Sequence, residues 1–278
     1  MKIIDVIPVV QSINPEDLAG RTAVVFDVLR ATSTMATALT NGCRAVVPVV
    51  EVEEARQAAA MLENKGIPVL LAGERGGRKV DGFPHGNSPL EFPPEVAAGK
   101  TLVLTTSNGT RALAAAARGA RTVLAGSLLN ARAVAGELLR LGQDITLICA
   151  GSEGRFSLED TLAAGMVVLE LVELISGNRP EEGSLKLLPL DLSDLTVTAL
   201  HLARAYRDNP RAAFDHSRHG RRLAAMGLAD DLDWCARLNV FPVVPVVKPG
   251  EGDLLSVITN RDENNTGRIT QKGSDPPS

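Results

Sequence analysis

Short apolar runs alternate with longer amphipathic stretches along most of the chain. Four of these runs have the length and composition of buried strands, namely residues 22–26, 101–104, 122–124 and 144–149. Each leads through a polar turn into a helical pattern, and two of the helices stop at Asn41-Gly42 and Leu141-Gly142, where glycine favours helix termination. Strands and helices that alternate in this way predict an α/β fold with a largely parallel sheet flanked by helices.

Other segments follow this pattern less well. Residues 73–89 are rich in glycine and lack a usable periodicity, and long loops of this kind in compact domains are usually functional or mobile. Further helices are expected around residues 195–206 and 218–226. Residues 241–247 contain two prolines, which cannot donate to a central ladder, so we expect an edge strand there. We expect one α/β domain over residues 1–247 and a partly disordered C-terminal extension over residues 248–278.

Composition and charge narrow the classes of function. With 278 residues, 45% of them hydrophobic, the chain can fill a core, which excludes disorder as the main state. The net charge is -4 and aromatic residues make up only 3%, so neither a basic field nor stacking platforms for nucleic acid are expected. Three cysteines are too few for a disulfide framework, and neither a signal peptide nor a spanning apolar run is evident. These features predict a soluble cytoplasmic protein that binds neither nucleic acid nor membranes. A homodimer, common for α/β enzymes of this size, is an open possibility.

Three of the four strand exits are rich in hydroxyls, amides and glycines. In a parallel sheet the loops that leave the carboxyl ends of the strands meet at one edge, where the first amides of the following helices are unpaired. Such an edge attracts anions, so the three loops together predict a phosphate cradle, although each loop alone is better explained by helix capping. The candidate phosphate- or substrate-binding residues in these loops are Thr32, Ser33, Ser107, Asn108, Gly109, Thr110, Gly151, Ser152 and Gly154.

Asp27 is the most informative single residue, because its carboxylate directly follows a buried strand, where desolvation is costly without a partner. A bound magnesium ion or the nearby Arg30 offsets that cost, and an aspartate in such a position can also attack phosphorus. A structural role, in which Asp27 caps the turn and pairs with Arg30, stays open. Asp160 is favoured over its neighbour Glu159, since adjacent helix residues point about 100° apart. The acids that can reach a shared metal are Glu74, Glu153, Glu159 and Asp160.

Arginines cluster around the same loops although the chain as a whole is acidic. Arg30 and Arg155 follow two of the strands, and Arg75 lies in the glycine-rich segment together with Arg78 and Lys79. Guanidinium groups suit carboxylate, phosphate and sulfonate oxygens because paired donors match paired acceptors. We therefore expect Arg30, Arg75 and Arg155 to contact a strongly anionic ligand. Arg78 and Lys79 are explained equally well as solvated loop residues.

A cysteine-dependent phosphatase is the main alternative among enzymes. Five residues separate Cys149 from Arg155 in a strand-to-helix loop, which is the spacing of the signature loop of those enzymes. The position before the cysteine is Ile148 rather than the usual histidine, and Glu153 adds negative charge to the loop. A cysteine that ends a buried strand is also most often a core residue. The cysteine scheme is therefore the weaker alternative.

Other motifs carry less weight. The triplet Arg218-His219-Gly220 resembles that of histidine phosphatases but precedes a late helix, so we interpret it as coincidental or as supporting the site indirectly. Neither a P-loop nor a dinucleotide fingerprint is present, which disfavours nucleoside triphosphate chemistry. A non-catalytic protein that binds phosphosugars or nucleotides is a further alternative. Such a binder gains nothing from acids such as Asp27 and Asp160 beside its loops unless a cation intervenes.

Taken together, these motifs resemble those of the 2-phosphosulfolactate phosphatase family. The resemblance rests on separate segments, in matching order and spacing, over about residues 2–247. They are DVLRATST (27–34), GERGG (73–77), GNSP (86–89), TTSNGT (105–110), GSEGRFSLED (151–160), SRHG (217–220) and DLDWCA (231–236). The resemblance implies a three-layer α/β/α fold with a mixed, largely parallel sheet. It also implies a magnesium-dependent phosphoric monoester hydrolase that converts 2-phospho-3-sulfolactate to 3-sulfolactate and phosphate, a step toward coenzyme M.

The motifs and the resemblance give a specific hypothesis for the site. Magnesium bound by Asp27 and by Glu153 or Asp160 bridges a phosphoryl oxygen, while hydroxyls and amides of the loops hold the others. Arg30 or Arg155 neutralises the charge that builds on the phosphoryl oxygens. Asp27 either attacks to form an acyl phosphate, or only holds the metal while a water attacks in line. The sequence leaves both courses open.

Overall fold

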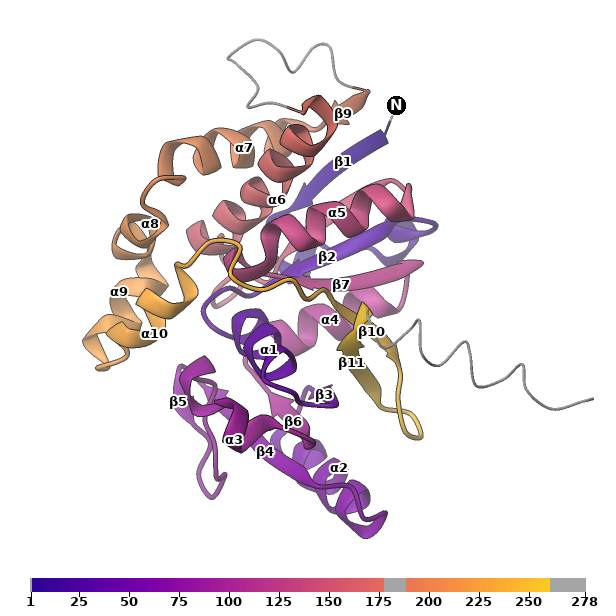
Figure 1. Ribbon diagram of the computed structural model, residues 1–278, viewed down its shortest axis with the longest axis vertical. Coiled ribbons are helices and arrows are strands. Elements are labelled where there is room, and N and C mark those ends of the chain that lie inside the picture. The colour runs from indigo at the N-terminus through magenta and orange to yellow at the C-terminus, as the bar shows by residue number, and fades with distance from the viewer. Residues whose placement is uncertain (1, 178–188, 261–278) are drawn as a thin grey trace, which may run out of the picture.

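The computed structural model describes residues 2–177 and 189–260, and within them it contains one mixed sheet of eleven strands with helices on both sides (Figure 1). The strands are β1 (Lys2–Ile7), β2 (Thr22–Phe26), β3 (Ala45–Val49), β4 (Val69–Arg75), β5 (Arg78–Lys79), β6 (Thr101–Thr105), β7 (Thr122–Gly126), β8 (Ile145–Cys149), β9 (Leu190–Leu192), β10 (Pro245–Pro249) and β11 (Leu255–Thr259). The helices are α1 (Ala31–Thr40), α2 (Val52–Asn64), α3 (Pro94–Ala97), α4 (Gly109–Ala117), α5 (Ala131–Leu141), α6 (Leu158–Ser176), α7 (Asp194–Tyr206), α8 (Pro210–His216), α9 (Arg218–Ala225) and α10 (Ala229–Cys235).

The strand order is β5-β4-β6-β3-β11-β10-β7-β2-β8-β1-β9. The four predicted strands are present as β2, β6, β7 and β8, and the two later helices as α7 and α9. Neighbouring strands are parallel except at β5 and around the hairpin of β10 and β11. The predicted three-layer α/β class with a mixed, largely parallel sheet is therefore confirmed.

The strand β2 lies between β7 and β8, and these three strands end at the same level. Phe26, the last residue of β2, is paired with Gly126 of β7 and with Cys149 of β8. All five residues of β2 are buried, as expected of a central parallel strand that is covered on both faces. The loops that follow the three strands therefore start side by side, and the loop after β2 begins with Asp27.

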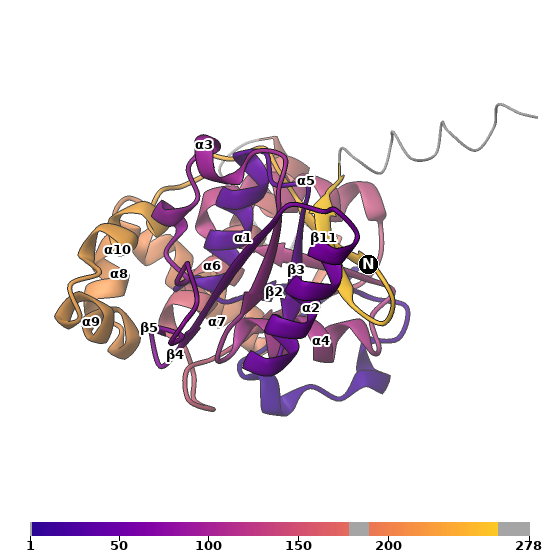
Figure 2. The same ribbon diagram turned by 90° about the horizontal axis from the view of Figure 1, so that it is seen from below.

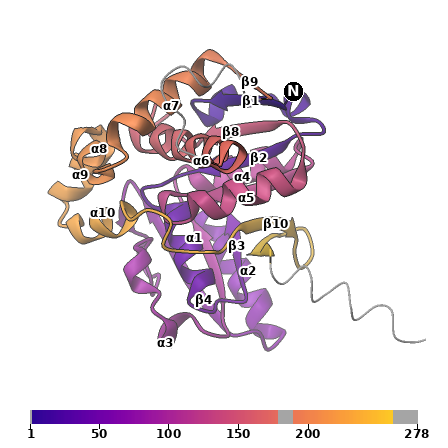
Figure 3. The ribbon, with the colours of Figure 1, turned by 45° about the horizontal axis from the view of Figure 1, so that its top comes forward.

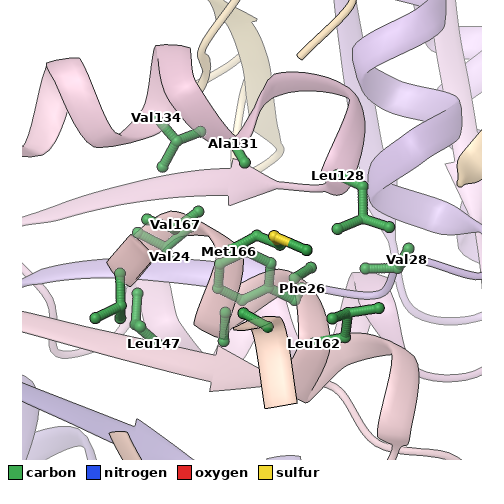
Figure 4. Packing of buried hydrophobic residues seen from close by; sticks show 14 of the residues in the cluster. Val24, Phe26, Val28, Leu128, Ala131, Val134, Leu147, Leu162, Met166 and Val167 are labelled. Carbon is green, nitrogen blue, oxygen red and sulfur yellow. The ribbon is translucent and has the colours of Figure 1, made fainter. Parts of the chain in front are cut away.

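Three apolar clusters hold the helices against the sheet. α5 and α6 cover one face of β2, β7 and β8, where Phe26 packs with Leu162 and Met166 of α6 (Figures 3 and 4). α1 and α4 share a second cluster with Ala23 and Val25, on the opposite face of β2, and both helices also contact β3. α2 covers β3, β4 and β6 in a third cluster (Figure 2). As a result, the first turns of α1, α4 and α6 all lie at the carboxyl ends of the strands.

The short helices α8, α9 and α10 gather at one end of the molecule in both Figure 1 and Figure 2. α9 contacts the loop after β2, since Nε2 of His219 donates a hydrogen bond to the carbonyl of Leu29 (2.9 Å). Residues of the C-terminal third of the chain thus contact the loops at the carboxyl ends of the central strands. We call the edge of the sheet where these loops meet the rim. Over the two described ranges, we find no helix with both the length and the apolar character needed to cross a membrane.

The C-terminal strands differ from the sequence-based expectation. The edge strand predicted at residues 241–247 is wrong, because β10 starts at Pro245 and lies inside the sheet, between β7 and β11. Proline is tolerated there since Pro245 opens the strand and only Val246 is in register with β7. β11 falls in the segment expected to be an extension, yet its Val257 pairs with Val46 of β3 within the sheet. The part of the predicted extension at residues 261–278 lies outside the described ranges.

Candidate active site

A cavity of about 160 Å³ lies at the rim where the strand exits meet. Its wall is built by the loops after β2, β4, β6 and β8, by the segment before α3, and by α9. The residues of this wall are Asp27, Leu29, Arg30, Glu74, Gly76, Gly77, Asn87, Ser107, Asn108, Ser152, Glu153, His219, Arg222 and Leu223. The wall brings together seven residues that the sequence singled out for the site, namely Asp27, Arg30, Glu74, Ser107, Asn108, Ser152 and Glu153.

Asp27 is a buried residue of this wall, with 8% of its surface exposed. Its main-chain amide donates to Oγ1 of Thr32 (3.2 Å), which helps to close the turn into α1. Gly109, the first residue of α4, lies so close that an added Cβ would come within 2.7 Å of Oδ2 of Asp27. Burial, and then the charge of Glu74, raise the pKa of Asp27 to about 7. The amides of Ala31 and Gly109 act in the opposite direction.

Glu74 is the second buried acid of the wall. Its Oε2 accepts a hydrogen bond from the amide of Gly77 (2.6 Å), and its Oε1 accepts one from the amide of Ser107 (2.7 Å). These bonds tie the turn between β4 and β5 to the loop after β6. Across residues 2–177 and 189–260, neither Glu74 nor Asp27 forms an ion pair with a cationic side chain. The cavity therefore holds two acids without a counter-charge, which is an expensive arrangement unless something positive binds there.

Arg30 lines the cavity, and both of its terminal nitrogens are bound to protein oxygens. Its Nη1 is 2.6 Å from Oδ2 of Asp231 on α10, and its Nη2 donates to the carbonyl of Gly77 (2.9 Å). Asp231 also accepts a hydrogen bond from the hydroxyl of Ser88 (2.5 Å). The side chains of the ion pair are 5% and 3% exposed, so Arg30 is a fixed group whose charge is largely compensated.

Glu153 and Arg222 form an ion pair at the mouth of the cavity. Nη1 of Arg222 lies 2.6 Å from Oε1 of Glu153, and Nη2 donates to the carbonyl of Gly76 (3.2 Å). Glu153 was a predicted metal ligand, but in the structure its carboxylate is paired with the guanidinium of Arg222. The ion pair leaves Asp27 and Glu74 as the uncompensated acids of the wall.

Two polar atoms of wall residues are buried without a hydrogen-bond partner in the part of the chain that the structure describes. They are Oδ1 of Asn87 and Nδ1 of His219. Because Nε2 of His219 donates to a carbonyl, Nδ1 of the neutral ring carries a free lone pair. Buried polar groups in proteins are normally satisfied, so these two atoms indicate a wall that is completed by a ligand, an ion or water.

Asp160 does not belong to the cavity wall. Its Oδ1 accepts a hydrogen bond from the amide of Val28 (2.9 Å) and its Oδ2 accepts one from the amide of Gly151 (3.1 Å). Its own amide donates to Oγ of Ser157, the N-cap of α6 (3.2 Å). Burial, and then the charge of Asp27, raise the pKa of Asp160 well above its usual range. The structure thus uses Asp160 to join the loops after β2 and β8.

The predicted hydroxyl residues beside the wall hold the turns together. Oγ1 of Thr32 accepts from the amide of Asp27, Oγ of Ser33 donates to a carbonyl of the same turn (2.8 Å), and Oγ1 of Thr110 donates to the carbonyl of Thr106 (3.1 Å). These are capping interactions of the kind that the sequence allowed for each loop taken alone. Thr32, Ser33, Thr110 and Gly151 lie outside the wall, and Gly109 adjoins it through its contact with Asp27.

Two of the three predicted arginines also lie outside the wall. Arg75 donates to the carbonyl of Val50 (2.8 Å) and to Oγ1 of Thr105 (3.0 Å), so it links the ends of β3, β4 and β6. Arg155 is exposed and lines a larger outer cavity of about 730 Å³ that shares part of its wall with the inner one. Gly154 is exposed in the same turn. Among the predicted arginines, only Arg30 is therefore placed at the inner cavity.

The position of Cys149 argues against the cysteine-dependent scheme. Its side chain is fully buried, and its sulfur contacts Oγ1 of Thr161 on α6 (3.7 Å) rather than the cavity. Burial, and then the charge of Asp160, raise the pKa of the thiol. A phosphatase of that class needs an accessible thiolate, so Cys149 is better explained as a core residue.

The donors of the wall fit a magnesium ion. Mg²⁺ is usually held by one or two carboxylates, while waters and substrate phosphates complete its octahedron. Asp27 and Glu74 offer uncompensated carboxylates, and Oδ1 of Asn87 offers an unpartnered hard oxygen. No closed cage of three His, Cys, Asp or Glu side chains forms anywhere in the described segments. The set therefore suits a cation that a phosphoester helps to bind, with Glu74 rather than Glu153 or Asp160 beside Asp27.

The chain is similar to a family of known proteins over most of its length. The profile of the family described as 2-phosphosulpholactate phosphatase matches residues 7–250. The chain belongs to this family. A protein of Symbiobacterium thermophilum named probable 2-phosphosulfolactate phosphatase is 42% identical over 240 residues, which cover 86% of this chain and 97% of the relative. Proteins of the same name from Thermotoga maritima and from Caldanaerobacter subterraneus subsp. tengcongensis are 41% and 39% identical; they are matched over 83% and 86% of this chain and over 90% and 92% of their own lengths.

Asn87, His219 and Arg222 line the wall although the sequence did not predict them as site residues; the triplet with His219 was interpreted only as coincidental or as supporting the site indirectly. Asn87 belongs to GNSP, His219 belongs to SRHG, and Arg222 follows His219 by three positions, which is the spacing of one helix face. Glu74 was one of several acids considered, without a preference for it. The sequence did contain a signal for these residues. Their motifs belong to the set that resembles one phosphatase family, so the polar residues of each motif were candidates for the wall of one site.

Proposed function

We propose that the protein is a magnesium-dependent phosphatase that hydrolyses 2-phospho-3-sulfolactate to 3-sulfolactate and inorganic phosphate. The observation that carries the proposal is the pair of uncompensated acids, Asp27 and Glu74, in a small cavity at the carboxyl ends of parallel strands. Membership of the 2-phosphosulpholactate phosphatase family supports the choice of substrate.

Charge balance supports a cation as part of this function. The substrate carries a phosphate, a carboxylate and a sulfonate, and the wall presents Asp27 and Glu74 without counter-charges while both of its arginines are paired. Anion and wall repel each other unless a cation lies between them. Asp27 and Glu74 would hold a divalent cation, and that cation would supply the positive charge that attracts phosphate.

The chain's own groups then orient the phosphoester. Asn108 and Ser152 line the cavity, and their side chains make no hydrogen bond within the described residues, so their donors are available to phosphoryl oxygens. The first turns of α1 and α4 add positive helix ends, and their amides at Ala31 and Gly109 are directed at Asp27. Arg30 contributes a fixed guanidinium to the wall. A bound divalent cation supplies Lewis-acid polarisation of the phosphoryl group.

Asp27 has two chemically distinct courses in this reaction. In one, a carboxylate oxygen attacks phosphorus as the ester P–O bond breaks, the departing alkoxide takes a proton from solvent, and water then hydrolyses the acyl phosphate to the carboxylate and inorganic phosphate. In the other, water attacks phosphorus directly as the same P–O bond breaks, its proton passes through solvent to the departing alkoxide, and Asp27 would serve only to hold the cation. Acid quench of a reaction with labelled substrate decides between them. Label retained on wild-type protein but not on Asp27→Asn protein indicates the first course, and no retained label indicates the second.

A panel of phosphomonoesters tests the proposed function. Purified protein is assayed for phosphate release from 2-phosphosulfolactate, 2-phospholactate and ethyl phosphate, each with Mg²⁺ and with EDTA. We expect 2-phosphosulfolactate to be hydrolysed with the highest kcat/KM, and only when Mg²⁺ is present. If no ester is hydrolysed although the same compounds bind in calorimetry, the protein is an anion-binding protein and the proposal is wrong.

A further inference from the structure

The wall between the inner cavity and the outer one is made of four residues. Ser152, Glu153, His219 and Arg222 line both cavities, and the ion pair of Glu153 with Arg222 is the charged part of this partition. A ligand whose phosphate lies near Asp27 and whose other end points outward meets this partition first. The partition is therefore where groups other than the phosphate are recognised.

The two arginines of the inner wall are not equally available to a ligand. The ion pair of Arg30 with Asp231 is 5% and 3% exposed, and both terminal nitrogens of Arg30 are bound to protein oxygens. Opening a buried pair of this kind leaves an uncompensated charge and is strongly unfavourable. The pair of Arg222 with Glu153 is 45% and 59% exposed, and exposed pairs of this kind contribute little to stability. Arg222 can therefore exchange its partner at low cost, whereas Arg30 cannot.

The backbone around Glu153 forms a tight turn beside Arg222. Glu153 has φ of 53°, in the left-handed region that favours glycine, and it lies in a turn with Gly151 and Gly154, whose φ values are 76° and 71°. The turn is closed by two backbone hydrogen bonds between Ser152 and Arg155, of 2.9 and 3.0 Å. A non-glycine residue is held in this conformation by its surroundings. The turn thus holds the backbone of an acidic residue beside the one exchangeable arginine that we find in the described wall.

We infer that Arg222 is a specificity-determining residue that binds the second anionic group of the substrate, and that Glu153 occupies its place until the substrate arrives. The inference rests on the proposed function for the identity of the substrate. A carboxylate or sulfonate of the ligand offers the oxygen pair that the guanidinium now takes from Glu153, so the exchange conserves charge-assisted hydrogen bonds. Esters without a second anionic group cannot make this exchange and gain nothing from Arg222.

The test compares Arg222→Gln with Arg221→Gln. Arg221 is the adjacent residue of α9, is exposed, and donates to the carbonyls of Asp215 and His216. Arg221 lines neither cavity, and neither of its partners lines the inner one, so its replacement removes the same charge without changing a residue of the inner wall. The readout is the ratio of kcat/KM for 2-phosphosulfolactate to kcat/KM for ethyl phosphate. We expect Arg222→Gln to lower this ratio by about tenfold or more, mainly through KM, because one charge-assisted contact is lost. Arg221→Gln is expected to keep the ratio. An unchanged ratio in Arg222→Gln overturns the inference.

Glu153→Gln is expected to change KM in the direction opposite to Arg222→Gln. This difference separates a role in substrate recognition from a purely structural one. Without the competing carboxylate, KM for 2-phosphosulfolactate is expected to fall severalfold, whereas a merely structural pair would raise KM in both single variants. A raised KM in Glu153→Gln overturns the inference. Two further esters identify the recognised group: 2-phospholactate carries only the carboxylate, and O-phosphoisethionate carries only the sulfonate. The ester whose ratio to ethyl phosphate falls in Arg222→Gln carries the group that Arg222 binds, and no fall for either overturns the inference.

Direct binding keeps this test independent of catalysis. Calorimetric titration of the wild type and of Arg222→Gln with 3-sulfolactate plus inorganic phosphate, in the presence of Mg²⁺, needs no turnover. Weaker binding of 3-sulfolactate to the variant, with equal binding of phosphate, supports the role of Arg222 even if no ester is hydrolysed and the proposed function fails. Equal binding of 3-sulfolactate to both proteins overturns it.

Discussion

Arg30 and Asp231, which are 201 positions apart in the chain, form a buried ion pair beside the cavity, with 2.6 Å between Nη1 and Oδ2. The pair fastens α10 to the loop after β2, and the hydroxyl of Ser88 binds the other oxygen of Asp231. The sequence predicted that Arg30 contacts the substrate and neutralises charge on its phosphoryl oxygens, with a structural pairing to Asp27 as the alternative. The structure instead makes it a rigid support whose removal affects folding as well as binding.

Replacing Asp231 by alanine is expected to destabilise the protein by roughly 3–5 kcal/mol, because the guanidinium of Arg30 is then buried without a counter-charge. The measurement is the free energy of unfolding from urea titration. Asp230→Ala is the matched control, since its side chain is exposed on the same helix, and it is expected to change stability by less than about 0.5 kcal/mol. Similar small effects for both variants would show that the buried pair is not a structural anchor.

Metal-free stability should depend on pH through Asp27. Its pKa is raised from 3.8 to about 7 in the folded state, so the native protein binds more protons than the unfolded chain between these values. The free energy of unfolding therefore falls as pH rises from about 4 to 7, by up to about 1.4 kcal/mol per pH unit from this group. Asp27→Asn has no carboxylate to ionise in the buried site. In EDTA, its stability relative to the wild type is therefore expected to be greater at pH 8 than at pH 5. An equal difference at both pH values contradicts this assignment.

Gly109→Ala should displace the carboxylate of Asp27. The added methyl group would lie 2.7 Å from Oδ2 of Asp27 and 2.7 Å from Cβ of Ala31, so one of them must move. A shift of this size at a positioned group is expected to lower kcat/KM by about 10²-fold. Gly136→Ala is the control, because the corresponding methyl group in α5 meets no atom within 4 Å. Wild-type kinetics in Gly109→Ala would mean that the position of Asp27 does not limit the reaction.

Cys149→Ser is expected to retain phosphatase activity at a level comparable to the wild type. The sulfur is buried against α6 and lies outside the cavity wall, so it neither reaches a phosphoester nor forms a thiolate readily. Phosphate release under saturating Mg²⁺ is the measurement. Loss of activity in a Cys149→Ser protein that still unfolds cooperatively would restore the cysteine-dependent scheme.

The fold and the rim could be predicted from local signals, but the direction of individual side chains could not. The central strands are apolar runs that end in polar turns, and the rule that parallel strands open on one edge placed Asp27 and Asn108 together. The same rule does not tell whether the side chain of Asp160 points toward the cavity or toward the amides of Val28 and Gly151. Either direction is compatible with an aspartate in the first turn of α6. That choice depends on packing between loops distant in sequence.

The role of α9 was hidden for a similar reason. His219 and Arg222 lie in a polar helix with no apolar run or glycine-rich loop to signal a site, and only tertiary packing brings them over the loop after β2.

The hairpin of β10 and β11 shows the limit of the rule that proline disfavours central strands. Proline excludes a fully paired central strand, but β10 contacts β7 through a single registered residue, so the rule was not violated by its place inside the sheet.

The dependence of phosphate release on Mg²⁺ concentration, measured for the wild type and for Asp27→Asn with 2-phosphosulfolactate, tests the central claim most directly. We expect the EDTA-treated wild type to be inactive and to regain full activity as Mg²⁺ is restored along a saturable curve. Asp27→Asn is expected to stay lower by on the order of 10³-fold at every Mg²⁺ concentration, because the carboxylate that anchors the cation or attacks phosphorus is missing. Full activity of the wild type in EDTA, or wild-type activity of Asp27→Asn, would contradict the account.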